Sequence, residues 1–259
     1  MNTKLKIAVV ALACALLIAF GWWRYSIAGK VVQTAIVFDI SRSERNRCSC
    51  LTALAERALG APGISVASTL TVFRTGDRAT ANEPLLLAQY QMPAHRKITE
   101  GKQITNQRRE EILQDLKARC EKLTPTDRSP VFYAVKRTTE HLQSLGCGNG
   151  SACLLYVLSD GEELTEPGIK EALAGRKLGA ALPATIPNEG VHILFIGLAQ
   201  TLGIEPGLGK YARQLTKDRD PQRADRLQEV WTERFTVKSL VSFEPFCAAP
   251  ANDGYVSQP

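Results

Sequence analysis

The sequence predicts a doubly wound α/β fold, with a mostly parallel central sheet, helices on both of its faces, and one N-terminal transmembrane helix before it. Short apolar runs bounded by turn residues alternate with longer segments of helical periodicity, which is the pattern of strands joined by helical crossovers. Several runs lack polar alternation, as expected of strands buried on both faces. A separate apolar run near the N-terminus predicts the membrane helix.

The predicted elements follow one another from residue 31. We expect strands at 31–38, 64–73, 85–90, 154–158 and 191–197, and helices at 50–59, 106–123, 131–145 and 221–234. A period of two over Phe235, Val237, Val241 and Phe243 predicts a final, half-exposed strand. Beyond Pro245 the apolar pattern ends. The chain length suits one large domain, so we expect an anchor over 1–29, a single domain over 30–245 and a flexible tail over 246–259.

The anchor is predicted from an uninterrupted apolar run of 17 residues, Ile7 to Trp23. Lys4 and Lys6 precede this run, which favours an N-terminus inside the cell. We therefore expect a single-pass protein of the inner (plasma) membrane whose bulk lies outside the cytoplasm, in the periplasm. The alternative is a cleaved signal peptide, because Ser26-Ile27-Ala28 resembles a small-x-small cleavage site.

The charge pattern argues against a nucleic-acid site. The chain carries a net charge of +6, to which Lys4 and Lys6 contribute. The densest basic stretches, 42–47 and 213–226, are interleaved with acidic residues, whereas a binder of phosphate backbones gathers Lys and Arg on one face. We expect a solvated surface of mixed charge and no nucleic-acid partner.

Six cysteines follow the anchor, an even number that suits disulfides in an oxidising compartment: Cys48, Cys50, Cys120, Cys147, Cys153 and Cys247. Cys147 and Cys153 flank a flexible Gly-Asn-Gly-Ser-Ala loop and form the best predicted pair. Cys120 falls on the apolar face of a predicted helix and is interpreted as a core thiol. Zinc at Cys48-Ser49-Cys50 is a weak alternative, because the three histidines are scattered singly.

Asp39-Ile40-Ser41-Arg42-Ser43 comes directly after the first predicted strand. Its carboxylate and hydroxyl oxygens are hard ligands on alternate residues, suited to a small cation such as Mg²⁺. Asp160 follows the predicted strand at 154–158. Because the carboxyl ends of parallel strands face one crevice, Asp160 is expected to reach the same place.

With these motifs, the sequence resembles the von Willebrand factor A family, over roughly residues 34 to 243. The family's metal-ion-dependent adhesion site joins an Asp-x-Ser-x-Ser, a Thr on a later loop and an Asp after a central strand. Asp39-Ile40-Ser41-Arg42-Ser43 is similar to the first element, and Ser159-Asp160-Gly161-Glu162-Glu163 to the third. For the second, the chain has Ser129 before Pro130 where the family usually has Thr, with Thr126 as the reserve candidate.

The resemblance implies roles for these residues. Ser41, Ser43 and Ser129 would bind Mg²⁺ (or Mn²⁺ or Ca²⁺) directly, and Asp39 and Asp160 directly or through water. One coordination position would stay open for an acidic side chain of a partner protein. The implied function is a membrane-anchored, noncatalytic module for metal-dependent protein–protein interaction.

Other interpretations remain open at this point. Asp39 and Asp160 could be turn residues, and Ser129 could cap the helix that starts near Pro130. Glu162 and Glu163 are interpreted as solvated side chains. A phosphatase that forms an aspartyl phosphate needs a second Asp where this chain has Ser41, so it is less favoured. A scaffold without metal is the main alternative function.

Overall fold

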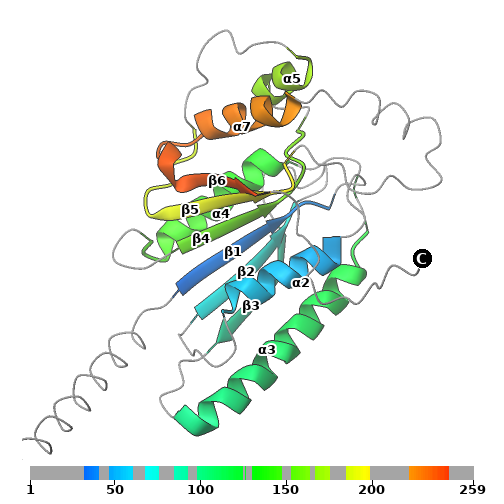
Figure 1. Cartoon of the computed structure of the whole chain (residues 1–259), viewed down its shortest axis with the longest axis vertical. Helices are drawn as coiled ribbons and strands as arrows, with labels where there is room; N and C mark the ends of the chain where they lie inside the picture. The colour runs from blue at the N-terminus through cyan, green and yellow to red at the C-terminus, as the bar shows by residue number, and fades with distance from the viewer. Residues whose placement is uncertain are drawn as a thin grey trace, which may run out of the picture.

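The computed structural model describes residues 32–40, 47–60, 68–75, 85–92, 98–124, 126, 130–147, 153–163, 167–175, 185–198 and 222–244 (Figure 1). The predicted anchor over 7–23 and the tail beyond 245 lie outside these ranges. Within them, no helix is long and apolar enough to cross a membrane.

The described strands form one sheet in the order β3-β2-β1-β4-β5-β6. They are β1 (Val32–Phe38), β2 (Ser68–Arg74), β3 (Leu85–Met92), β4 (Cys153–Leu158), β5 (Val191–Ile196) and β6 (Val241–Glu244). Each neighbouring pair is parallel except β2 and β3, which run antiparallel. The predicted mostly parallel sheet is confirmed.

Helices cover both faces of this sheet (Figure 1). The helices α2 (Arg47–Ala58) and α3 (Ile98–Glu121) pack on one face; α4 (Val131–Ser144), α5 (Pro167–Leu173) and α7 (Arg223–Glu233) pack on the other. Along β1, Ala35 and Val37 face the second group, and Ile36 and Phe38 face the first. Alternation along a strand thus sends successive side chains into two cores, which explains why the second half of β1, Ala35 to Phe38, is apolar without interruption.

The spatial order of the strands creates a switch point between β1 and β4. From β1 the chain first proceeds to β2 and β3 on one side, and then crosses to β4 on the other. In open α/β sheets, ligands bind beyond the carboxyl ends of the strands at such a point. Phe38 pairs with Leu158 at these ends, so the residues that follow the two strands are neighbours.

Three elements differ from the sequence-based prediction. The helix expected at 106–123 begins earlier, at Ile98. The short helix α5 was not predicted. The strand expected from Phe235 is confined to β6, because a 3-10 turn, Lys238–Leu240, precedes it. Phe235 is fully buried and forms an isolated parallel β-bridge with Ile186. Its apolar character therefore reflects its place in the core with residues of α7 and β5.

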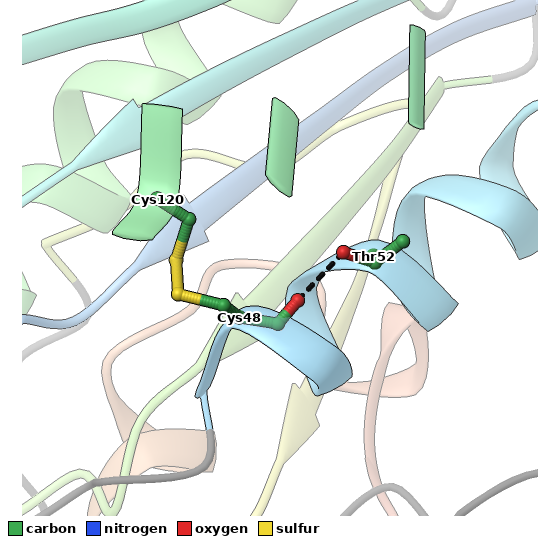
Figure 2. The surroundings of a disulfide bond; sticks show 3 residues. All are labelled: Cys48, Thr52 and Cys120. Carbon is green, nitrogen blue, oxygen red and sulfur yellow. Dashed lines mark hydrogen bonds between the residues drawn. A yellow bond between two sulfur atoms is a disulfide. The ribbon is translucent and has the colours of Figure 1, made fainter. Parts of the chain in front are cut away.

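Two disulfides join described cysteines. Cys147, just after α4, is bonded to Cys153, the first residue of β4, which confirms the predicted pair. Cys120 is bonded to Cys48, with Cα atoms 5.6 Å apart (Figure 2). The interpretation of Cys120 as a core thiol is therefore wrong: its side chain is buried, as the apolar face predicts, but α2 brings Cys48 against it. Cys50 is disulfide-bonded as well.

Candidate metal-binding site

Asp39 and Asp160 lie beyond the carboxyl ends of two neighbouring strands. The amide of Asp39 donates a hydrogen bond to the carbonyl of Leu158, with N and O 3.0 Å apart. This bond continues the β1–β4 ladder past the last paired residues and fixes Asp39 beside Ser159. Asp39 is 1% exposed and Asp160 7% exposed. The residues that directly follow β1 and β4 therefore lie side by side.

The Ser159 hydroxyl links the two segments directly. Its Oγ donates to Oδ2 of Asp39 at 2.8 Å and accepts the amide proton of Gly161 at 3.0 Å. Ser159 therefore orients the Asp39 carboxylate and shapes the turn that holds Asp160. Sequence reasoning gave Ser159 no role. Its place at the end of a buried strand, before Asp-Gly, is a signal that could have indicated one.

The turn after Asp160 is closely packed. Oδ1 of Asp160 accepts the amide proton of Glu162 at 3.1 Å, so the alternative role of Asp160 as a turn residue is also present. Gly161 has φ +70°, and an added Cβ would lie 2.2 Å from Cδ1 of Leu198. The indole N–H of Trp231 donates to the carbonyl of Gly161 at 3.2 Å. Only glycine fits this turn, because the backbone conformation and the space both exclude a side chain.

Glu162 and Glu163 are not the solvated side chains that the sequence indicated. Glu162 forms an ion pair with Arg223 of α7, and its side chain is only 17% exposed. Burial raises the pKa of the Glu162 carboxyl to about 7, and the nearby Asp160 charge acts in the same direction, against the lowering effect of Arg223. Glu162 is therefore a mostly buried, ion-paired side chain near Asp160.

Glu163 has a different role at the start of α4. It is 5% exposed, and its Oε2 accepts the amide proton of Phe132 at 2.7 Å. The first amides of a helix lack partners within the helix, and a carboxylate there satisfies one of them. The residue before α4 is Pro130, with no side-chain cap bond. Glu163 therefore joins the loop after β4 to the start of α4.

The hydroxyl candidates are placed only in part. Ser41, Ser43 and Ser129 lie outside the described residues. Thr126, the reserve for Ser129, is described: its amide donates to the carbonyl of Ile40 at 2.9 Å. This contact puts the chain before α4 beside the residue that follows Asp39. On the other side, the amide of Ile40 donates to Oγ1 of Thr75 at 3.2 Å, so loops after β1, β2 and α3 meet here.

No protein-family model matches the chain, and a search of curated proteins finds no relative. The solved structures to which the chain is similar include the following two. One is the manganese-loaded TRAP protein of Plasmodium vivax, at 13% identity and a TM-score of 0.41, covering 85% of this chain and 70% of that one. The other is the pilus adhesin SpaC from Lactobacillus rhamnosus GG in its open conformation, at 11% identity and a TM-score of 0.43. It covers 85% of this chain, which spans 28% of the adhesin's length.

The oxygen atoms of the described side chains are of the chemical type that a hard divalent cation binds. Asp39 and Asp160 offer carboxylate oxygens, and Ser159 offers a hydroxyl that contacts Asp39; such oxygens are the ligands of Mg²⁺ and Ca²⁺. In the part of the chain that the structure describes, no group of three or more His, Cys, Asp or Glu side chains could hold a metal ion. Cys48 and Cys50, the residues of the alternative zinc interpretation, are both disulfide-bonded.

Proposed function

We propose that this chain is a von Willebrand factor A-like module that binds one divalent cation, Mg²⁺ (or Mn²⁺ or Ca²⁺), and uses it to hold a partner protein. The observation that carries the proposal is the hydrogen bond from Ser159, the residue before Asp160, to the carboxylate of Asp39 at the switch point of the sheet. This is the position at which open α/β sheets bind their ligands. The Asp-x-Ser-x-Ser motif begins at that point.

The proposed ligands are Asp39, Ser41, Ser43, Ser129 and Asp160, with Thr126 in reserve for Ser129. The contact between Thr126 and Ile40 supports the approach of the loop before α4 to the Asp39 segment. When bound, the cation would supply an open coordination position for an acidic side chain of the partner. The chain's own contribution is to hold the two carboxylates in place through Ser159 and the Gly161 turn.

A noncatalytic role is favoured over phosphoryl transfer. An aspartyl-phosphate enzyme would place a general acid two residues after Asp39, and Ser41 stands there.

The proposed location is the outer side of the inner (plasma) membrane, in the periplasm, with the chain tethered through residues 7–23. Every cysteine that the structure describes is disulfide-bonded. Disulfides persist in oxidising compartments and are rare in the cytosol. The disulfides therefore support an extracytoplasmic domain.

A scaffold without metal is the second candidate. Asp39 accepts a hydrogen bond from Ser159, and Asp160 accepts one from the amide of Glu162. Such bonds would satisfy both carboxylates in a chain that never binds a cation. Such a scaffold would have the same fold and would bind its partner without a metal ion.

The deciding experiment is calorimetric titration of Mg²⁺ and Mn²⁺ into the full chain in detergent micelles. Three variants accompany the parent: Ser41→Ala/Ser43→Ala, Asp160→Asn and, as the matched control, Asp115→Asn on α3. Asp115 is a carboxylate bonded to Tyr90 and Arg119, away from the candidate site. Saturable binding by the parent and the control, but not by the first two variants, is expected. Absence of binding by the folded parent would leave the metal-free scaffold.

A further inference from the structure

The Cys48–Cys120 disulfide joins two segments that lead into the candidate site (Figure 2). Cys48 lies in the first turn of α2, which directly follows the stretch that carries Ser41 and Ser43. Cys120 lies in the last turn of α3, and the stretch after that helix carries Thr126 and Ser129. Proposed ligands come from three segments: the one after β1, the one after α3 and the one after β4. The disulfide adjoins the first two in the sequence.

Two hydrogen bonds lie close to this disulfide in the chain. On one side, the amide of Thr126 donates to the carbonyl of Ile40 at 2.9 Å, which ties the chain after α3 to the chain after β1. On the other side, Oγ1 of Thr52 donates to the carbonyl of Cys48 at 2.6 Å within the first turn of α2 (Figure 2). Cys120 is 3% exposed. The disulfide therefore holds the start of α2 against the end of α3, next in sequence to the two stretches that carry the proposed ligands.

We propose that the Cys48–Cys120 disulfide is a positioning element of the cation site, so that the site reaches its full affinity only after this bond has formed. This inference rests on the proposed function. Small cations demand near-ideal placement of their oxygen ligands, and here those ligands come from separate loops. A cross-link at the base of two loops removes conformations that they would otherwise lose on binding.

The second disulfide provides a matched control. Cys147 and Cys153 are bonded at the amino end of β4, whereas Ser159 and Asp160 follow its carboxyl end. A strand rises about 3.3 Å per residue, so the two ends of β4 lie roughly 17 Å apart. Removing this second bond also removes a covalent link, but no loop of the candidate site is tied by it.

The experiment compares the parent chain in detergent micelles with Cys48→Ala/Cys120→Ala and with Cys147→Ala/Cys153→Ala. Mn²⁺ affinity is measured by titration well below each variant's unfolding temperature. Amide hydrogen exchange is measured separately in chelator for Ile40 and Thr126, with Val157 in the buried strand β4 as the internal reference. The exchange arm requires no cation and reports the placement of the two segments directly.

We expect the Cys48/Cys120 variant to bind Mn²⁺ about 10-fold to 100-fold more weakly, as when supporting groups of a metal site are removed, and the Cys147/Cys153 variant to stay within about twofold of the parent. Exchange at Thr126 should accelerate more than at Val157 in the first variant alone. Parental affinity or parental Thr126 exchange in that variant would overturn the proposal. A folded parent that binds no Mn²⁺ would refute the proposed function instead, and Thr126 exchange would still decide whether the bond positions the two segments.

Discussion

The hydroxyl of Ser159 donates to the carboxylate of Asp39 across the β1–β4 boundary, with Oγ and Oδ2 2.8 Å apart. These two residues are far apart in the chain, yet each directly follows a strand of the central pair. The same hydroxyl accepts the amide proton of Gly161. One small side chain thus joins the Asp39 segment to the turn of Asp160.

Replacing Ser159 with Ala should lower the free energy of unfolding by about 1–3 kcal/mol, because it leaves the buried Asp39 carboxylate and the Gly161 amide each short of one partner. Urea unfolding followed by circular dichroism measures this. Ser144→Ala is the control: its hydroxyl donates to His141 at an exposed helix end, and it should change stability by less than about 0.5 kcal/mol. Equal effects of the two substitutions would contradict the bridging role of Ser159.

Gly161→Ala should destabilise the chain more than Gly175→Ala. Both glycines have φ +70°, so both substitutions carry the same backbone penalty of roughly 1–2 kcal/mol. Only at Gly161 would the new Cβ lie 2.2 Å from Leu198 and 2.9 Å from Nε1 of Trp231, whereas nothing lies within 4 Å at Gly175. Overpacking should add about 1–3 kcal/mol. Thermal melts of the two variants test this, and equal melting temperatures would refute the crowding at Gly161.

The pH dependence of the metal-free chain should carry the signature of Glu162. Its pKa is raised from 4.5 to about 7 in the fold, so the folded state holds a proton that the unfolded state has released between these values. The contribution of Glu162 to the free energy of unfolding therefore falls as pH rises from the unfolded to the folded pKa, by up to about 1.4 kcal/mol per pH unit. The loss is complete above the folded pKa.

The test is the difference in unfolding free energy between the parent and Glu162→Gln, measured in chelator at about pH 5 and about pH 8, on either side of the folded pKa. Contributions of groups that do not interact with Glu162 cancel in this difference. The parent should lose stability relative to the variant at the higher pH. A relative gain instead would mean that the ion pair with Arg223 outweighs burial.

The Arg57–Glu244 pair should contribute little despite its good geometry. The two terminal guanidinium nitrogens of Arg57 donate to the Glu244 carboxylate, at 2.8 and 3.2 Å, but the side chains are 53% and 42% exposed. A double-mutant cycle with Arg57→Ala and Glu244→Gln should give a coupling of about 0.2–1 kcal/mol. Hydrogen bonding to Arg57 lowers the pKa of Glu244, so the coupling should be present at neutral pH and disappear as pH falls through that lowered pKa. A coupling that persists in acid would contradict this assignment.

Much of the fold could be predicted because local patterns specify it. The apolar residues Ala35 to Phe38 predict a strand buried on both faces. Along α4, Val131, Val135, Thr138 and Leu142 are buried at the expected helical spacing. The Cys147–Cys153 pair also follows from sequence, because a short loop holds the two residues together. Asp39 and Asp160 could be placed at strand ends for the same reason: strand termination is a local property.

What the sequence alone determined is therefore the set of elements, their order along the chain and the polar residues that follow β1 and β4. The tertiary structure decided which elements are neighbours. The position of β1 beside β4, the bond between Ser159 and Asp39, and the pairing of Cys48 with Cys120 across 72 residues all depend on it. The burial of Glu162 against Arg223 does as well. The physical reason is that helix and strand periodicity act over a few residues, whereas these contacts arise only when the two cores bring distant segments of the chain together.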